Sequence, residues 1–480
     1  MCYYIYVSRR FMKNSFILIL IIIVFLGSSV FFFHEDFKNL LRNYLPFHTK
    51  SYVNSILLDR EISYTKKEQA FNAMKDFFEV TDTPQLKKFN NPEYFTSNEV
   101  NIDLYETNFL KKVKNLKAKG GSYLALLDND LLIAQENGLF FSLPVNFIES
   151  SNESIELKNI PSNIFSLIRY FDFYSTGSYG LKGMFADKNH LYISISYMKE
   201  PNCFNTSILR AEVSNIFLSF EEFFIPNQCV KINNKYGEFN ASDSGGRISN
   251  FKTNKILFST GAFRYRDLAQ DPEGHLGKIL SIDKDTSKAQ VISLGHRNVM
   301  GLAYLSKSNE IWSTEHGPNG GDEINLNRLN IKTNPVNFGW PISSYGEHYD
   351  ASAKNPEGAL IVDLEHRLYS KAPLYKSHED YGFKEPEIFF TPSIGISAIQ
   401  GIDKNFINDS NYDLVFGSLG KTLDQYIPSE RSLYLYNSEE KNLKKIFRGE
   451  RIRDILYVQS SSRIIFSGET TGIIGVISRK

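Results

Sequence analysis

The sequence lacks an excess of charge of either sign and contains few cysteines. Its 480 residues include 54 Lys and Arg and 54 Asp and Glu, so the formal net charge is zero. A nucleic-acid-binding protein would normally carry a basic stripe, and this balance argues against one. The three cysteines show no CxxC or Cys/His spacing, so the sequence predicts no zinc site.

Long hydrophobic runs are also missing, with one exception near the N-terminus. Residues 16–33 (FILILIIIVFLGSSVFFF) carry no charge and are just long enough to span a bilayer as a helix. Arg9, Arg10 and Lys13 precede the run, and the positive-inside rule then places the N-terminus in the cytoplasm. We expect a cytoplasmic tail over 1–14, an uncleaved anchor over 15–33 and a periplasmic or extracellular main domain. A cleaved signal peptide is the alternative, and it too exports the domain.

The export of the main domain bears on the cysteines. Cys2 would be cytoplasmic, whereas Cys203 and Cys229 would lie outside, where oxidation is allowed. Both lie in polar, loop-like surroundings, and we predict that they pair. Two free thiols in adjacent strands are the alternative.

Residues 34–115 are predicted to form a separate segment. Within Ser63–Val80, the apolar residues Ala70, Met74, Phe77 and Phe78 have helix-like spacing. This spacing predicts a helical spacer between the anchor and the main domain.

A repeat runs from about residue 116 to the C-terminus. Polar turns are followed six times by short apolar strands, which begin near residues 131, 191, 256, 311, 414 and 464. Strand-rich repeats of this length are typical of propeller blades with four strands each. The 14% aromatic content also favours sheets. We therefore predict an all-β, six-bladed β-propeller over 116–480, with a β-sandwich as the alternative. The longest gap predicts an inserted loop over 341–385 on the functional face.

Three polar blocks carry candidate chemistry. Arg297 and Asn298 offer a guanidinium that forks onto a carboxylate and an amide that both donates and accepts. Residues 317–323 offer carbonyls and carboxylates, a mixed oxygen set that calcium prefers. Arg451 and Arg453 alternate along a strand, so both face one side, where an anion would relieve their repulsion. Taken alone, these blocks also suit ion-paired turns, a solvated acidic turn or an outward-facing edge strand.

Together the blocks resemble the soluble quinoprotein glucose/sorbosone dehydrogenases, which include the bacterial aldose sugar dehydrogenases. That family shows GHRNPQGL, EHGPxGGDEIN, NYGWP followed by SYG, and a late RIRD or RYRD. This chain has, in the same order, GHRNVMGL, EHGPNGGDEIN, NFGWPISSYG and RIRD. The resemblance covers about residues 116–480. It implies a six-bladed propeller that binds pyrroloquinoline quinone (PQQ) and calcium in its channel and oxidises sugars.

The resemblance also implies roles for the matching residues. Arg297 and Asn298 would contact the quinone, and Arg451 and Arg453 would bind the cofactor's carboxylates. The implied calcium ligands are the carbonyls of Gly317 and Pro318 for the catalytic ion, and Glu323 with the Phe338 backbone for a second, structural ion.

The chain departs from the family pattern at the general base. The family has a His four residues before an Arg, and this chain has Asp243 four residues before Arg247. An ordinary aspartate, with a pKa of about 3.9, is a weak base. The candidate catalytic residues are therefore Asp243 and Arg297, with His348 as an alternative base in the loop after Trp340. Loss of a base typically costs about 10²–10⁴ in rate.

Other positions depart as well. The early glycine-rich block has Ser178 and Gly183 in place of its polar side chains, and a Gly-Asp pair reads Gly261-Ala262. A lysine expected in the fifth repeat is at best shifted to Lys421, and an aromatic position before a late proline is Thr391.

Two functions remain open from the sequence. The first is a membrane-anchored dehydrogenase that oxidises a sugar or other small polyol with PQQ and calcium. The alternative is a non-catalytic, calcium-stabilised propeller that binds a glycan or protein. The retained arginines favour the first, and the altered base favours the second. A third possibility is hydrolysis by a calcium-bound water.

Overall fold

The computed structural model describes residues 83–107, 121–136, 138–149, 153–167, 180–214, 216–235, 239–318, 320–329, 335–347, 373, 377–407, 411–420 and 431–480. The chain divides into two compact units, Met1–Thr65 and Lys66–Lys480, and every described residue belongs to the second. The predicted tail, anchor and helix at 63–80, and most of the predicted insertion at 341–385, lie outside the described residues. Among the residues described, no helix is long and apolar enough to cross a membrane.

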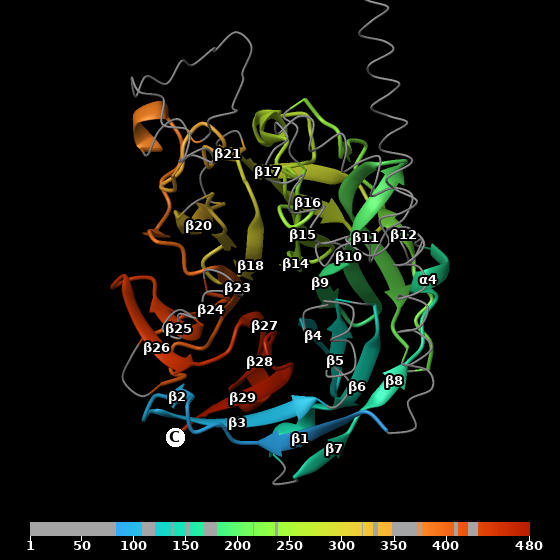
Figure 1. Cartoon of the computed structure of the whole chain (residues 1–480), viewed down its shortest axis with the longest axis vertical. Coiled ribbons are helices and arrows are strands. Elements are labelled where there is room, and N and C mark those ends of the chain that lie inside the picture. The colour runs from blue at the N-terminus through green and yellow to red at the C-terminus, as the bar shows by residue number, and fades with distance from the viewer. Residues whose placement is uncertain are drawn as a thin grey trace, which may run out of the picture. The chain divides into compact units, whose positions relative to one another are not determined.

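Six sheets surround a common centre in the second unit (Figure 1). We number them blades 1 to 6 and give each from its inner to its outer strand. Blade 1 has β4 (Ser122–Leu127), β5 (Asp130–Gln135), β6 (Phe140–Pro144) and β8 (Lys158–Ile160). Blade 2 has β9 (Leu181–Ala186), β10 (His190–Glu200), β11 (Cys203–Glu212) and β12 (Glu221–Phe224). Blade 3 has β14 (Gly245–Phe251), β15 (Lys255–Thr260), β16 (Lys278–Asp283) and β17 (Ala289–Leu294).

The other three blades follow the same plan. Blade 4 has β18 (Val299–Leu305), β19 (Glu310–Glu315), β20 (Asp322–Arg328) and β22 (Ile388–Phe390). Blade 5 has β23 (Ile396–Gly401), β24 (Leu414–Ser418), β25 (Ser432–Asn437) and β26 (Asn442–Arg448). Blade 6 has β27 (Ile452–Val458), β28 (Arg463–Gly468), β29 (Ile473–Arg479) and β3 (Val100–Thr107).

Short elements extend the blades at their edges. The added strands are β13 (Val230–Lys231) on β11, β21 (Val336–Asn337) on β17, β2 (Phe95–Thr96) on β26, β1 (Gln85–Phe89) on β3 and β7 (Ser154–Glu156) on β1. The helical turns are η2 (Val145–Glu149), α4 (Ile164–Leu167), η3 (Arg266–Gln270), η5 (Glu379–Tyr381) and η7 (Gln459–Ser461).

The six inner strands close a ring. They contact one another in the order β4, β9, β14, β18, β23, β27 and back to β4. This order places blade 3 opposite blade 6 across the centre. The predicted all-β, six-bladed propeller is therefore confirmed.

The repeated strands of the sequence are the second strands of the blades. The predicted starts near 131, 191, 256, 311, 414 and 464 fall on β5, β10, β15, β19, β24 and β28. These strands read as nearly continuous apolar runs because both of their faces are covered by neighbouring blades. Residues 256–258 of β15, for example, are fully buried.

The hydrophobic core lies between the blades. One cluster joins Leu257 of blade 3 to Val299 and Ile311 of blade 4, and another joins Trp312 of blade 4 to Phe416 of blade 5. Burial of large side chains on both faces of a sheet contributes roughly 1.5–3 kcal/mol for each. The ring is thus stabilised mainly at its blade interfaces.

Hydroxyl groups also join neighbouring blades, and they explain the small polar residues that end the repeats. In four blades, a Ser or Thr of the second strand donates to a carbonyl of the next blade's inner strand. The pairs are Ser194 to Gly246, Ser259 to Val299, Thr314 to Ser397 and Ser467 to Ser122. All four hydroxyl-bearing residues are fully buried or nearly so. A buried carbonyl without a partner is costly, so these four bonds stabilise the contacts between blades. We call them the blade latches.

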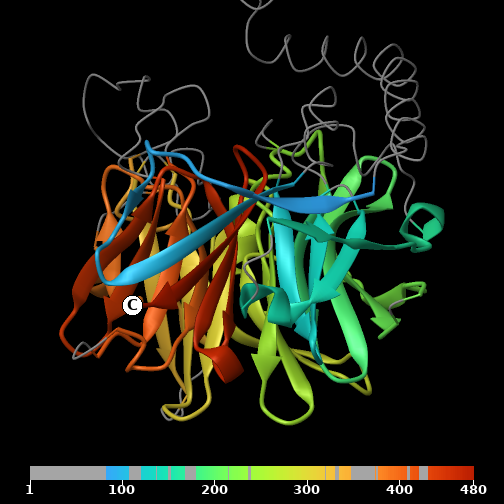
Figure 2. The same cartoon turned by 90° about the horizontal axis from the view of Figure 1, so that it is seen from below.

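The N-terminal strands correct the predicted boundary of the propeller. Residues 83–107 were expected in a helical spacer, but β3 is the outer strand of blade 6 and pairs along its whole length with β29. In Figure 2 the blue N-terminal strands run along the red C-terminal blade. The pairing joins Thr107 to Gly472, 365 positions apart, which local spacing cannot reveal. The expected spacer at 108–115 lies outside the described residues.

The predicted disulfide is confirmed. Cys203, the first residue of β11, is bonded to Cys229, which precedes β13. The same segments pair as strands, with Phe204 opposite Val230. The bond therefore fixes the edge of blade 2.

Candidate functional site

The candidate site residues lie where the inner strands begin. Asp243 lies just before β14, Arg297 and Asn298 just before β18, and Arg451 just before β27. Inner strands of four-stranded blades all run in the same direction, so their first residues gather at one end of the channel. The contacts agree, because Asp243 pairs with Arg297 at 3.1 Å and the Gly245 amide donates to Asn298 Oδ1 at 3.0 Å.

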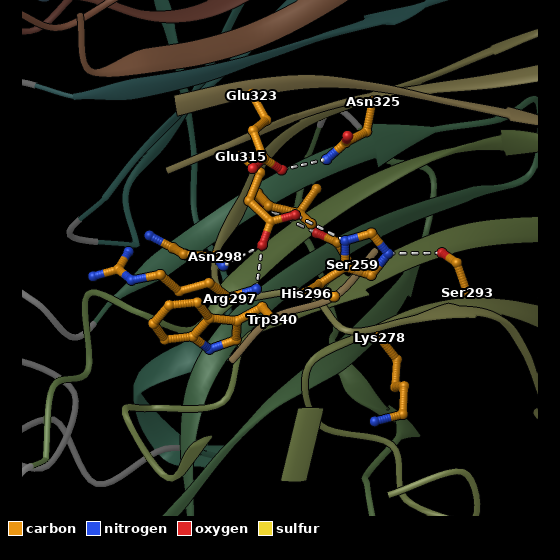
Figure 3. Close-up of polar contacts among 12 residues, drawn as sticks. Ser259, Lys278, Ser293, His296, Arg297, Asn298, Glu315, Glu323, Asn325 and Trp340 are labelled. Carbon is orange, nitrogen blue, oxygen red and sulfur yellow. Dashed lines mark hydrogen bonds and ion pairs between the residues drawn. The ribbon is translucent and has the colours of Figure 1, made fainter. Parts of the chain in front are cut away.

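Glu315 organises the Gly295–Asn298 turn, as Figure 3 shows. Its Oε1 atom accepts from the backbone amides of Arg297 and Asn298, and its Oε2 atom contacts His296 Nδ1 at 2.8 Å. The other imidazole nitrogen meets Ser293 Oγ at 2.8 Å. The GHRN and EHG motifs are therefore bonded to each other, and Glu315 is a site residue that the sequence analysis missed.

Asp243, at the family's base position, is held by two arginines. Its Oδ2 atom accepts from Arg297 Nη2 and from Arg264 Nε, both at 3.1 Å, and its side chain is only 7% exposed. Among the described residues, nothing donates a hydrogen bond to Oδ1. The carboxylate thus carries a fixed side and an available side.

Arg264 is a second residue that the sequence analysis missed. It and Phe263 both have left-handed backbones, with φ of 68° and 50°. Such conformations cost of order 1–3 kcal/mol each in a non-glycine residue, so the surrounding structure must impose them. Phe263 is fully buried and stacks on Phe239, and this packing turns Arg264 toward Asp243.

Arg451 and Arg453 share a buried carboxylate. Arg451 Nη2 lies 3.5 Å from Glu469, Arg453 also pairs with Glu469, and Arg453 Nε lies 3.4 Å from Glu136. Burial opposes the charge of Arg453, but the two carboxylates outweigh it and raise the pKa of that guanidinium. Burial dominates at Arg451 and lowers its pKa. The anion between the two arginines is therefore the protein's own Glu469 carboxylate, a partner that the sequence did not reveal.

A small pocket collects three of the four predicted metal residues. Gly317, Glu323 and Phe338 line a cavity of about 10 Å³, which Arg297 and Trp340 also line. A cavity of this size holds about one water-sized occupant. Arg297 lies over the Trp340 ring, 5.8 Å from its centre, as Figure 3 also shows.

Glu323 already has partners within the protein. Asn325 Nδ2 donates to its Oε2 at 3.2 Å, and His378 Nε2 lies 3.4 Å from its Oε1. Burial raises the pKa of Glu323, although the neighbouring His378 opposes the shift. Ser343 Oγ contacts the other imidazole nitrogen of His378 at 3.1 Å. Among the residues that the structure describes, no cluster of three His, Cys, Asp or Glu side chains could hold a metal ion.

The positions that depart from the family pattern have local explanations where they are described. A Cβ at Gly183 would collide with the Gly246 carbonyl, so blade 2 has no room for a side chain there. Thr391 accepts from the Gly321 amide at 3.1 Å and donates to the Tyr345 carbonyl at 3.1 Å. Ser178, His348 and Lys421 lie outside the described residues.

A second histidine, His316, adjoins the GHRN turn. It follows Glu315, its carbonyl accepts from Arg297 Nη1 at 3.1 Å, and it lines the same pocket as Glu323. Burial lowers the pKa of His316. Its Nε2 atom is buried and has no hydrogen-bond partner among the described residues.

Comparison with solved structures shows the same fold. The apo form of the soluble aldose sugar dehydrogenase from Escherichia coli matches with a TM-score of 0.56 and 19% identity, covering 79% of this chain and 100% of that one. The PQQ-bound aldose sugar dehydrogenase from Streptomyces coelicolor matches with a TM-score of 0.50 and 16% identity, covering 75% and 95%.

Sequence comparison finds shorter matches. The aldose sugar dehydrogenase YliI of Escherichia coli is 31% identical over 140 residues, which is 26% of this chain and 36% of that protein. An uncharacterised Synechocystis protein, slr1608, is 38% identical over 97 residues, which is 18% of this chain and 22% of that one. The matched part thus spans about a fifth to a third of these relatives' length. The model of the Glucose / Sorbosone dehydrogenase family matches residues 176–474, well over half of the chain, and the protein belongs to that family.

Proposed function

We propose that this chain binds PQQ at the strand-start end of its channel and oxidises a hydroxyl group of a sugar or small polyol. The observation that carries the proposal is the set of buried guanidiniums of Arg297, Arg451 and Arg453, which are 5–8% exposed. A tricarboxylate suits such a set because guanidiniums bind carboxylates through forked hydrogen bonds. Arg451 Nε is also buried without a hydrogen-bond acceptor among the described residues. This orphaned donor is the local feature that fits an added carboxylate.

The residues present would divide the work as follows. Arg451 and Arg453 would hold carboxylates of the cofactor, and Arg297 with Asn298 would lie at its quinone. PQQ, when bound, supplies a two-electron acceptor for hydride. Asp243 would accept the hydroxyl proton at Oδ1, since Oδ2 is occupied by Arg264 and Arg297. The Glu315 carboxylate would keep the Arg297–Asn298 backbone in place.

We extend the proposal to calcium at two places. The carbonyls of Gly317 and Pro318 would hold an ion that acts as a Lewis acid. Glu323 and the Phe338 backbone would hold a second ion, which would compete with His378 for the Glu323 carboxylate. A calcium-dependent rise in melting temperature that EDTA reverses would support these sites.

The test is a titration of the full chain in detergent with PQQ in the presence of calcium, followed by absorbance. We expect saturable binding at micromolar cofactor and a loss of at least tenfold in affinity in Arg297→Ala. Lys404→Ala, which removes an exposed ion pair with Glu439 on blade 5, is the control and should bind as the parent does. No binding by the parent would end the proposal.

A second function is favoured by one specific observation. Asp243 sits between two arginines, as a permanent counter-ion would, and this arrangement suits a non-catalytic propeller that binds a glycan or protein. PQQ binding without turnover of any aldose would favour it. Activity that appears only in Asp243→His would show that the base was the missing part.

We also propose that residues 15–33 anchor the protein in a membrane, with the propeller outside the cytoplasm. The disulfide between Cys203 and Cys229 supports this placement because such bonds persist in oxidising compartments. Release of the protein from membranes by sodium carbonate would contradict the anchor. Resistance of the propeller to protease added to spheroplasts, with digestion once the cytoplasmic membrane is opened, would contradict the placement outside the cytoplasm.

A further inference from the structure

Two motif residues have no role in the proposed chemistry. Arg247 ends the string that begins at Asp243, and Asp454 ends the string that begins at Arg451. The structure pairs them, with Arg247 Nη1 2.6 Å from Asp454 Oδ1 and side chains only 9% and 8% exposed. Two separate motifs therefore end in one buried ion pair.

This pair crosses the channel. Arg247 belongs to β14 of blade 3 and Asp454 to β27 of blade 6, which lie on opposite sides of the ring of inner strands (Figure 1). An ion pair of 2.6 Å between opposite blades leaves no open passage between those two residues. The ion pair therefore bridges the channel at this depth.

Arg247 also contacts two further blades. Its Nε donates to the Met300 carbonyl of blade 4, and its guanidinium lies 5.0 Å from the centre of the Tyr123 ring of blade 1. On the other partner, Asp454 Oδ2 accepts from the Leu124 amide of blade 1 at 2.8 Å. One cation thus ties together strands from four blades.

The pair lies deeper in the channel than the candidate site. Asp243, Arg297 and Arg451 precede their inner strands, whereas Arg247 and Asp454 lie inside β14 and β27. Since the inner strands start at the same end, the ion pair lies beneath the site residues. We call the Arg247–Asp454 ion pair the floor of the channel.

Arg247 also holds the backbone that carries Arg453. The pairing of β27 with β28 is interrupted between Ile452 and Asp454, which leaves Arg453 at a β-bulge. Arg247 Nη2 donates to the Arg453 carbonyl at 2.7 Å and so replaces the missing constraint from across the channel. The position of the Arg453 guanidinium then depends on a residue of the opposite blade.

We propose that Arg247 and Asp454 form a fixed floor that makes the site reachable from one end of the channel only, and that Arg247 is the positioning residue for Arg453. The floor stands on the geometry alone, and the part about Arg453 as a cofactor ligand rests on the proposed function.

The floor is tested by a double-mutant cycle on urea unfolding with Arg247→Met, Asp454→Asn and the double variant. Removing one partner of a buried pair should raise the unfolding equilibrium constant on the order of 10²–10³-fold, because the other charge stays buried and unpaired. The double variant should recover at least about tenfold relative to the product of the single effects. If the two single substitutions change the unfolding equilibrium constant independently, so that their effects multiply in the double variant, the proposed floor is overturned. Lys404→Met, at an exposed ion pair with Glu439, is the control and should change little.

The positioning role is tested in a milder variant, Arg247→Lys, which keeps the charge and loses the fork. Hydrogen exchange of amides in 452–458 should accelerate at least tenfold, although the substitution lies on the opposite blade. Exchange in blade 2 should stay as in the parent. Unchanged exchange in 452–458, with the variant folded, would overturn the positioning role.

A PQQ titration connects the inference to the proposed function and separates their failures. Arg247→Lys should lower the affinity about tenfold in the parent and cause no further loss in Arg453→Lys. Equal losses in both backgrounds would overturn the positioning of a cofactor ligand. If the parent binds no PQQ, the proposed function falls, and the unfolding cycle and the exchange rates still decide the floor and the positioning role.

Discussion

At the residue scale, the exchange of the family's histidine for Asp243 changes what its neighbours do. A carboxylate between Arg264 and Arg297 gains two charge-assisted hydrogen bonds, which a neutral imidazole would not. Arg264 has a left-handed backbone at this place. Asp243 and the strained turn that carries Arg264 therefore form one ion-paired group. A substitution at position 243 should change both the charge of this group and its ability to accept a proton.

The proton-acceptor role predicts the outcome of Asp243→Asn. An amide cannot take a proton, so kcat for aldose oxidation should fall about 10²–10⁴-fold. PQQ affinity should be retained or rise, because Arg297 loses its competing carboxylate. The matched variant is His316→Gln, which should keep kcat within a few fold. Loss of activity in His316→Gln with normal activity in Asp243→Asn would move the base to His316.

The role of Glu315 predicts a stability loss in Glu315→Gln. The amide group keeps the size of the carboxylate but weakens the bonds to His296 and to the Arg297 and Asn298 amides. Hydrogen bonds to charged groups contribute about 1.5–3 kcal/mol each, so the free energy of unfolding should fall by about 2–4 kcal/mol. Urea unfolding measures this change. A fall below about 0.5 kcal/mol would mean that the Gly295–Asn298 turn is stable without the Glu315 carboxylate.

At the scale of the element, the second strands carry most of what the sequence reveals. Every second strand is covered on both faces by neighbouring blades, so each one is an apolar run after a polar turn. The pattern recurs along the sequence for this reason. The inner strands leave a weaker one, since bulges interrupt β9, β14, β18, β23 and β27. Among the site residues there, Asp243 can be recognised only through the family motif. Their partners Glu136, Glu469 and Arg264 come from other segments and had no spacing to mark them.

The blade latches predict the effect of Ser467→Ala. The Ser122 carbonyl would lose its donor in a buried place, and the free energy of unfolding should fall by about 1–3 kcal/mol. Ser478→Ala, at a half-buried position near the end of β29, is the control and should change stability by less than about 0.5 kcal/mol. Equal changes in the two variants, measured by urea unfolding, would show that the latch contributes nothing of its own.

At the scale of the whole molecule, the ring is closed by a strand from the other end of the chain. β3 completes blade 6 beside β29, and β1 continues that sheet to β7. The sequence predicted the number of blades because each one leaves a repeat. It could not predict this closure, because β3 lies before the first repeat and its partner after the last. The helix-like spacing nearby led the boundary to be drawn too late.

The closure predicts different fates for two truncations. A chain that starts at residue 83 should fold, whereas one that starts at residue 108 should leave the edge of β29 unpaired and aggregate or unfold. Circular dichroism and size-exclusion chromatography compare the two. A soluble, cooperatively unfolding chain from residue 108 would contradict a closing role for β3.

The central claim is that the channel still performs redox chemistry with an altered base. The most direct measurement is the absorbance of protein-bound PQQ after rapid mixing with an aldose, in the absence of an added electron acceptor. The account predicts that the oxidised quinone spectrum disappears in a single turnover, at least about 10²-fold more slowly in Asp243→Asn. A bound, oxidised cofactor that persists in the parent with every aldose and polyol offered would contradict it.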